Sequence, residues 1–272
     1  MGVGDLSFAA VASLKSIDSW IAVINSNMAG SGRVGYKASR IKFGGGTVSS
    51  ARPTVSPLLG INFAEQSLGT METTIDFSQG SVAASTDFTH LAVQRTSAAP
   101  GMFTLNTADD GSGEYYYTFD GEFHLNPSGY MINADGLYVM SNSNGGIDAL
   151  GKDAGDIVND QLSLDRVLIT VFGNPQLQLG FSRFGSGVFE ELGANNLLVP
   201  TVASQATIDA IGNYTNANGS GRVIPFALEA SNSSLTQAVP ELALAQKMYS
   251  AIAKVIQVAL ANIDTALQLG PR

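Results

Sequence analysis

"NSNMAGSGRVGYKASR" (residues 25–40) ends a long helical pattern with three glycines inside six residues. Glycine adopts the left-handed conformation of a helix stop at little cost, so Gly30 and Gly32 predict that the helix ends here. Tyr36 and Lys37 follow on the far side of the break. The stretch therefore predicts a helix that must stop so that the chain can leave it in a new direction.

The helical segment before this stop carries apolar residues at alternating steps of four and three. They are Ala10, Leu14, Ile17, Ile21, Ile24 and Met28. A segment near the other end of the chain repeats the pattern with Ala245, Tyr249, Ile252, Ile256, Ala259, Ile263 and Ala266. Such steps are typical of a coiled-coil seam. We expect the two seams to pack together as a subunit-packing layer that brings the termini side by side, although an ordinary helical hairpin on a core would show the same pattern.

The middle of the chain has a strand-like pattern instead. Segments such as "LDRVLITVF" (164–172) alternate on a two-residue period, and glycine and Asn-Pro turns separate them. Asp120-Gly121 and Asp135-Gly136 are dipeptides of the type that closes β-hairpins. We therefore predict an α+β fold, with N- and C-terminal helices paired in a coiled-coil-like layer and a β-rich domain between them.

Pro240 precedes the last helical pattern, at a position where a helix start tolerates proline. The shifts in composition along the chain predict five parts. The parts are an N-terminal helix with its stop motif (1–43), an extended connector (44–70), a β-rich outer domain (71–205), a return connector (206–240) and a C-terminal helix that pairs with the first (241–272).

Composition narrows the classes of partner. Only 14% of the residues are charged, which favours a surface covered by self-association, although a solvated Ser/Asn/Thr/Gly-rich surface would also fit. The net charge of −9 argues against nucleic acid, and the absence of cysteine excludes disulfides and thiolate metal sites. The sequence contains no run of 18 apolar residues, so it predicts no membrane-spanning helix. Its N-terminus lacks the basic region that is typical of a secretory leader.

The sequence offers no persuasive active site, so we predict no enzyme, cofactor or metal. His90 and His124 lack the spacing of a zinc pair, and no G-x-S-x-G elbow is present, although composition alone leaves Ser-His-Asp catalysis open. Four aspartates could hold calcium, but each lies in a turn, where aspartate is favoured for backbone hydrogen bonding alone. They are Asp109, Asp110, Asp120 and Asp135. Asn232 begins an Asn-x-Ser triplet, which matters only in a glycosylating compartment.

Four motifs resemble the bacterial flagellar hook and basal-body rod proteins. Residues 27–37, "NMAGSGRVGYK", are similar to the family's Asn-Leu-Ala-Asn-x-Asn-Thr-x-Gly-Phe/Tyr-Lys, with matches at Asn27, Ala29, Gly35, Tyr36 and Lys37. Residues 117–140 resemble a Tyr-Thr-Arg-Asp-Gly block, with matches that include Asp120 and Gly121 but with Phe119 in place of arginine. Residues 172–190 resemble a Phe-x-Asn-Pro-x-Gly-Leu stretch. Residues 228–259 resemble the C-terminal Leu-Glu-x-Ser-Asn segment and its helix, with matches that include Gln246, Lys254 and Gln257.

This resemblance implies a structural subunit that assembles head-to-tail into the helical tube of a flagellar rod or hook, or of a hook-like tube. The terminal helices would form the inner layer, and the partners would be copies of the chain, adjacent axial proteins and the flagellar export apparatus. It implies a place in the flagellum, in the periplasm or outside the cell, reached without a cleavable leader. The compact β domain favours a rod-type subunit or a short hook.

Two other classes compete with this reading. A β-rich surface protein or adhesin would share the polar middle of the chain, but it would have no need of sealed helical ends. A hydrolase on a β scaffold would require an acid–base pair beside a pocket.

Overall fold

The computed structural model describes residues 3–45, 48–51, 62–65, 67–95, 101–143, 146–164, 166–171, 179–183, 187–191 and 221–269. The chain divides into two compact units. Unit 1 comprises Met1–Ala29, Ser39–Ile75 and Ser234–Arg272, and unit 2 comprises Gly30–Ala38 and Asp76–Ser233. Helices at both ends and antiparallel strands between them make this an α+β fold, as predicted.

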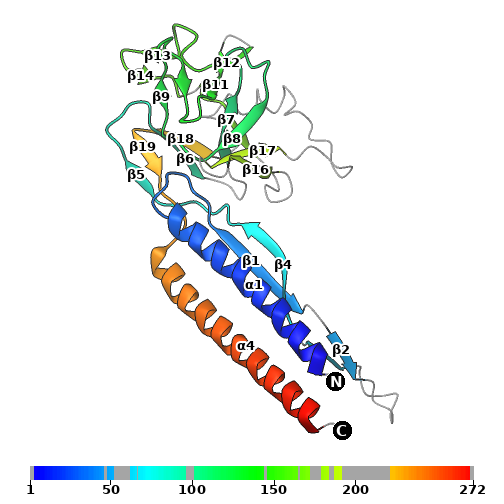
Figure 1. The fold of residues 1–272 in the computed structure, drawn as a ribbon. Helices are drawn as coiled ribbons and strands as arrows, with labels where there is room; N and C mark the ends of the chain where they lie inside the picture. The colour runs from blue at the N-terminus through cyan, green and yellow to red at the C-terminus, as the bar shows by residue number, and fades with distance from the viewer. Residues whose placement is uncertain are drawn as a thin grey trace. The chain divides into compact units, whose positions relative to one another are not determined.

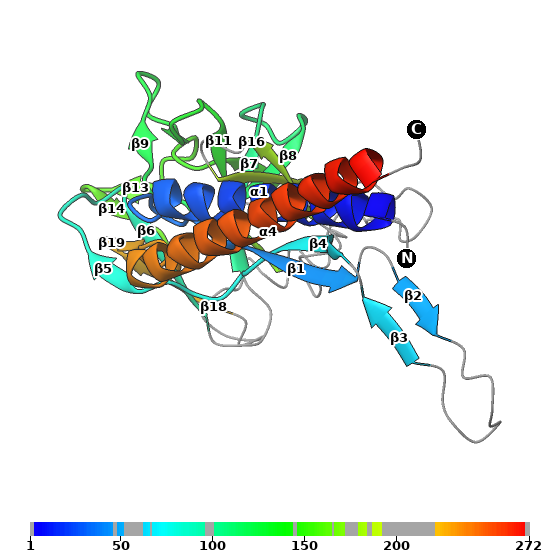
Figure 2. The ribbon, with the colours of Figure 1, turned by 60° about the horizontal axis from the view of Figure 1, so that its bottom comes forward.

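Unit 1 contains the two long helices, α1 (Val3–Gly30) and α4 (Leu235–Leu269). They lie side by side and run in opposite directions, so the start of α1 and the end of α4 are neighbours (Figures 1 and 2). A cluster of apolar side chains joins the helices, with Ile17 and Ile24 of α1 packed with Ala238 and Ala245 of α4.

Helix α4 begins earlier than the sequence suggested. The carbonyl oxygen of Ser234 accepts the N–H groups of Gln237 and Ala238, so the first turn forms at Leu235. Pro240 consequently lies inside the helix and not ahead of it, which corrects the expectation that it marks the helix start. At this position proline lacks the N–H group that an α-helix would otherwise donate to the carbonyl oxygen of Thr236, four residues earlier.

An antiparallel hairpin of β1 (Ser39–Gly45) and β4 (Leu68–Ile75) packs along α1, and β2 (Val48–Ala51) pairs with β3 (Asn62–Glu65) (Figure 2). Ser13 of α1 accepts the backbone N–H of Leu68 at 2.9 Å, and Ser16 donates to the carbonyl oxygen of Leu68 at 2.9 Å. These two bonds satisfy both backbone groups at the start of β4. The indole of Trp20 meets the ring of Phe43 edge-on, with centroids 5.5 Å apart.

Unit 2 is built around a nine-stranded sheet with the order β16-β17-β8-β7-β11-β10-β9, in which β12 also pairs with β11 and β15 with β7. Its strands are β7 (Gly101–Asn106), β8 (Tyr115–Thr118), β9 (His124–Leu125), β10 (Met131–Ile132), β11 (Tyr138–Ser143), β12 (Gly146–Ala149), β15 (Ile169–Val171), β16 (Leu179–Arg183) and β17 (Val188–Glu191). Strand β7 is buried along its whole length and lies at the centre of the core.

One of the two predicted hairpin turns is confirmed and the other is wrong. Strands β10 and β11 pair across the turn that contains Asp135 and Gly136, and Gly136 has a φ of 77°. The strands on either side of Asp120-Gly121 do not pair with each other, because β8 lies between β7 and β17 while β9 pairs with β10. A Cβ on Gly121 would overlap the carbonyl oxygen of Leu91, so this glycine permits a close backbone crossing instead.

Unit 2 also contains three two-stranded ribbons. Strand β5 (Val82–Ala84) pairs with β19 (Ala227–Glu229), β6 (Leu91–Arg95) with β18 (Gly221–Pro225), and β13 (Ile157–Val158) with β14 (Gln161–Leu162). Strands β18 and β19 thus lie in the 206–240 range predicted as a return connector. Much of that range, and much of 44–70, falls outside the described residues. In the described part of the chain, neither helix combines the length and apolarity needed to span a membrane.

Candidate functional site: the motif junction

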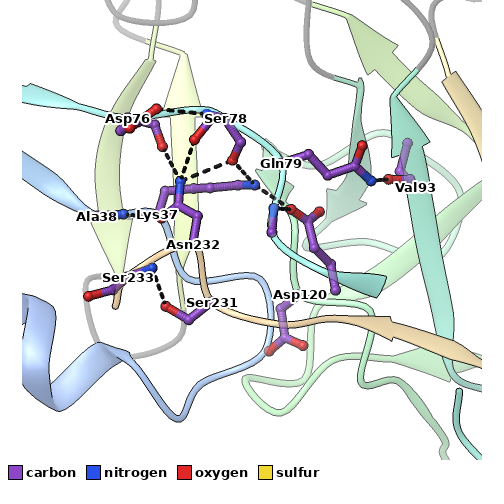
Figure 3. A network of polar contacts seen from close by, with 12 residues as sticks. Lys37, Ala38, Asp76, Ser78, Gln79, Val93, Asp120, Ser231, Asn232 and Ser233 are labelled. Atoms are coloured by element: carbon purple, nitrogen blue, oxygen red, sulfur yellow. Dashed lines mark hydrogen bonds and ion pairs between the residues drawn. The ribbon is translucent and has the colours of Figure 1, made fainter. Parts of the chain in front are cut away.

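Three of the sequence motifs meet in unit 2. The N–H of Gly35 donates to the carbonyl oxygen of Glu229 at 2.7 Å, and the N–H of Asn232 donates to that of Tyr36 at 3.2 Å. The N–H of Asp76 donates to the carbonyl oxygen of Ala38 at 2.7 Å. We call the site formed by residues 30–38, 76–80, 119–121 and 229–232 the motif junction (Figure 3).

Lys37 is the charged centre of the motif junction. Its Nζ lies 2.6 Å from Oε1 of Glu229, and the two side chains are only 2% and 3% exposed. The same ammonium donates to the carbonyl oxygen of Ser78 at 3.0 Å and lies 4.2 Å from the centroid of the Phe119 ring. A buried charge is tolerated only when it is paired and hydrogen-bonded, and here contacts from three other segments of unit 2 meet that requirement.

Glu229 connects its own segment to the chain around Gly80. Its Oε1 accepts the N–H of Gly80 at 2.7 Å in addition to the ammonium of Lys37. A Cβ on Gly80 would overlap the carbonyl oxygen of Ala230, so the two backbones approach more closely than any other residue allows. The N–H of Ala230 donates to the carbonyl oxygen of Ser81 at 2.8 Å. The Glu229 carboxylate, the close approach at Gly80 and the hydrogen bond from Ala230 to Ser81 thus fix the two segments where they cross.

Asn232 makes the corresponding connection on the other side of Lys37. Its Oδ1 accepts the N–H of Ala38 at 2.7 Å, and its Nδ2 donates to the carbonyl oxygens of Asp76 at 2.7 Å and Ser78 at 3.0 Å (Figure 3). One amide side chain therefore joins three parts of unit 2: the end of its first segment at Ala38, the start of its second segment at residues 76–78, and the later segment that contains Asn232. Asn232, the first residue of the Asn-x-Ser triplet noted in the sequence, therefore has a structural role.

The glycines of residues 30–38 act through steric fit. Helix α1 ends at Gly30 as predicted, but neither Gly30 nor Gly32 has a positive φ. A Cβ on Gly30 would overlap the buried ring of Tyr36, which corrects the expected left-handed stop. Gly35 is the residue of this stretch in the left-handed region, with a φ of 64°. A Cβ there would overlap the backbone of Phe119.

Asp120 adds a half-buried carboxylate beside this contact. The pKa of Asp120 is raised to about 6, mainly by desolvation on burial and to a smaller extent by the nearby charges of Glu122 and Asp135, while a hydrogen bond from the N–H of Glu122 opposes the shift. That N–H donates to Oδ1 of Asp120 at 2.9 Å. The bond is an Asx turn, as predicted for the turn aspartates, and Asp110 forms another with Ser112.

A small cavity lies beside the ion pair. Its volume is about 10 Å³, and its lining residues are Lys37, Phe77, Gln79, Val93, Gly101, Phe119 and Glu229. Cavities that bind organic ligands occupy roughly 300–1,000 Å³, whereas roughly 10–15 Å³ holds one water molecule. The motif junction is therefore suited to holding chain segments together and not to binding a metabolite.

The structure brings a serine, a histidine and an aspartate together elsewhere in unit 2. The Oγ of Ser85 lies 2.7 Å from Nδ1 of His90, whose Nε2 lies 3.6 Å from the exposed carboxylate of Asp87. The Ser85 Oγ also accepts the N–H of Asp87, which is the geometry of a local turn. Among the described residues, no group of three His, Cys, Asp or Glu side chains has the arrangement of a metal site.

The predicted seam residues lie in unit 1. On α1, Ala10, Ile17 and Ile24 are buried, and Leu14, Ile21 and Met28 are half-buried. On α4, Ala245 and Ala259 are buried, Ile252, Ile256 and Ile263 are half-buried and Tyr249 is exposed. The side chain of Ala266 lies outside the described residues.

The predicted motif residues divide between the two units. Tyr36, Lys37 and Gly35 enter the motif junction together with Asp120 and Gly121. The other five lie in unit 1 on the helices: Asn27 and Ala29 on α1, and Gln246, Lys254 and Gln257 on α4. Asn27 exchanges two hydrogen bonds with the backbone of Ser39, at 2.7 and 2.8 Å, and so fixes the start of β1. Sequence reasoning missed the roles of Glu229 and Asn232, although both lie in the C-terminal segment that carries the resemblance.

The comparisons with known proteins agree with the motifs. The flagellar basal-body rod protein FlgG of Bacillus subtilis (strain 168) is 26% identical over 265 residues, which cover 92% of each chain. The FlgG protein of Caulobacter vibrioides is 30% identical over 161 residues, or 58% of each chain. That of Borreliella burgdorferi is 25% identical over 195 residues, or 66% of this chain and 64% of that protein. No protein-family model matches the chain. These relatives confirm the predicted resemblance to the flagellar rod and hook proteins.

Proposed function

We propose that this relative of the flagellar basal-body rod proteins is a structural subunit that self-assembles head-to-tail into a helical tube. A head-to-tail contact whose rotation does not close generates an open filament. The relatives are named as rod proteins, which supports a rod subunit over a hook subunit. The partners in this proposal are copies of the chain and the axial proteins next to it.

The observation that carries this proposal is a second apolar stripe on α4, which is exposed. Leu244, Val255 and Val258 are 52%, 44% and 60% exposed, and with the exposed Ala251 they follow one another at steps of seven, four and three. This spacing places them on one face, beside the face that packs with α1. A helix with two apolar faces requires a second neighbour.

From Gln246 onward, the face of α4 away from this stripe is largely polar. Gln246, Ser250 and Lys254 are exposed at steps of four, and Gln257 and Asp264 continue the same stripe. A neighbouring subunit that covers the apolar stripe can leave this polar stripe in contact with water. We propose that α1 and α4 pair as a coiled-coil-like inner layer and that the β-rich domain lies outside it.

Burial of the exposed stripe supplies the driving force for assembly. A fully buried valine or leucine side chain contributes about 1.5–3 kcal/mol. Ordering of the helices on assembly offsets part of this gain. We further propose export through the flagellar type III apparatus to the rod or hook of the flagellum, a route that accepts unfolded chains without disulfides.

The test compares two double variants of the full chain. Val255→Ser with Val258→Ser removes apolar surface that is exposed in the single chain, so we expect it to fold but to raise the critical concentration for tubes about 100-fold or more. Gln246→Ser with Gln257→Ser changes the polar stripe of the same helix and serves as the control. Electron microscopy and sedimentation measure tube formation. Equal critical concentrations for the two variants would overturn the proposal.

A further inference from the structure

Unit 2 contains segments from both sides of its β-rich middle. Residues 30–38 precede the middle in the chain, while β18, β19 and residues 230–233 follow it. The later segment adds strands β18 and β19 to β6 and β5. Completion of unit 2 therefore requires two segments that are distant in sequence to dock on the same core.

We infer that Lys37 makes the docking of these two segments interdependent, so that they attach and detach as one cooperative latch. The ammonium of Lys37 belongs to the first segment, and the carboxylate that neutralises it belongs to Glu229 of the second. Both side chains are almost completely buried. Departure of the second segment would leave the Lys37 ammonium without its carboxylate partner, which strongly disfavours the remaining contacts of the first segment.

The reverse dependence follows from the same geometry. Without the first segment, Oε1 of Glu229 would retain the N–H of Gly80 but lose its ammonium partner. The carbonyl oxygen of Glu229 would also lose the N–H of Gly35, and Oδ1 of Asn232 would lose the N–H of Ala38. When either segment detaches, charged or amide groups of the other segment therefore lose hydrogen-bond partners.

This interdependence is different from a contribution to stability. Replacement of a buried ion pair by apolar groups of similar size is often neutral, whereas removal of one partner leaves an uncompensated charge. A latch thus predicts that a single substitution opens both segments and that a second substitution, which removes the remaining charge, closes them again. A merely local contact predicts no effect on amides that Lys37 does not touch.

Hydrogen exchange of the full chain distinguishes these two cases. The reporters are the N–H groups of Ala230 and Asn232, which bond to Ser81 and Tyr36 and not to the Lys37 side chain. The N–H of Met131, which bonds to the carbonyl oxygen of Leu150 in the core, is the internal reference. We expect Glu229→Gln, which keeps the shape of the side chain, to raise exchange at both reporters and at Gly35 at least tenfold relative to Met131.

The restoring variant combines Lys37→Met with Glu229→Gln, and we expect it to return exchange at the reporters to within threefold of the wild type. Lys42→Met is the matched control, because Lys42 pairs with Glu72 on an exposed part of unit 1. Unchanged exchange at Ala230 and Asn232 in Glu229→Gln would overturn the inference. Equal opening in the single and double variants would also overturn it, since the uncompensated charge would then have no special effect.

Discussion

A Cβ atom placed on Gly35 would lie 2.5 Å from the backbone nitrogen of Asp120, so two motifs that are far apart in the sequence touch through their backbones. Gly35 also has a φ of 64°, a conformation that side-chain-bearing residues rarely adopt. Its neighbours Tyr36 and Lys37 extend from this fixed point into the buried part of unit 2. The glycine therefore sets the position of the whole N-terminal segment.

We expect Gly35→Ala to destabilise unit 2 by about 2–5 kcal/mol, since left-handed strain costs about 1–2 kcal/mol and overpacking about 1–3 kcal/mol. Urea unfolding of the full chain, followed by the near-ultraviolet signal of the tyrosines, measures the change. Gly32→Ala is the matched control, because a Cβ on Gly32 meets nothing within 4 Å and its φ is not positive. Equal unfolding midpoints for the two variants would contradict the role given to Gly35.

The helices were readable from the sequence because each carries its periodicity within a few turns. The steps of four and three predict Ile17, Ile24 and Ala245 as seam residues, and these side chains belong to one apolar cluster of α1 and α4. The end of α1 at Gly30 was also predicted. The reason for a glycine at this position was not predicted. It is the close packing of the Tyr36 ring, and residue spacing alone does not show where that ring packs.

Only part of the motif junction could be predicted from the sequence, for a related reason. Lys37 was identified through the resemblance, but its partners Glu229 and Ser78 are brought to it by tertiary folding. Local sequence gives no distance between such segments. The same limit explains the error at Asp120-Gly121, where the dipeptide is typical of a hairpin but the glycine instead permits a close backbone approach to Leu91.

Removal of a hydroxyl group from α1 tests the attachment of the hairpin in unit 1. Ser13 is buried and its Oγ accepts the N–H of Leu68, so Ser13→Ala leaves that N–H without this acceptor. We expect a loss of about 1–2 kcal/mol and faster hydrogen exchange at Leu68. Ser19→Ala is the control, since the exposed Ser19 bonds to the carbonyl oxygen of Lys15 within its own helix. The idea fails if exchange at Leu68 is the same in both variants.

A third prediction concerns Asn232, whose side-chain amide bonds to Ala38, Asp76 and Ser78. Asn232→Ala removes all of these bonds at once, and we expect a destabilisation of about 2–4 kcal/mol because each lost bond contributes about 1 kcal/mol. Thermal unfolding in a calorimeter measures it. Asn262→Ala, at an exposed site on α4, should change the stability by less than about 0.5 kcal/mol. A small effect at Asn232 would show that water replaces the amide without loss.

The raised pKa of Asp120 predicts an unusual dependence of stability on pH. Its value of about 6 in the folded protein lies above the ordinary 3.8, so the folded state binds this proton more tightly than the unfolded state does. The stabilisation from protonation is complete below pH 3.8 and is lost as the pH rises through 6. Ionised Asp120 thus weakens the fold at neutral pH.

We therefore expect Asp120→Asn to stabilise the protein by about 1–2 kcal/mol at pH 7, with the gain disappearing near pH 4. The amide oxygen can still accept the N–H of Glu122, so the turn is retained. Asp110→Asn should act in the opposite direction, because hydrogen bonds from Ser112 lower the pKa of that exposed carboxylate. Urea unfolding at several pH values from 4 to 7 compares the two variants with the wild type. A difference between Asp120→Asn and the wild type that stays constant over this range would show that burial does not control the titration of Asp120.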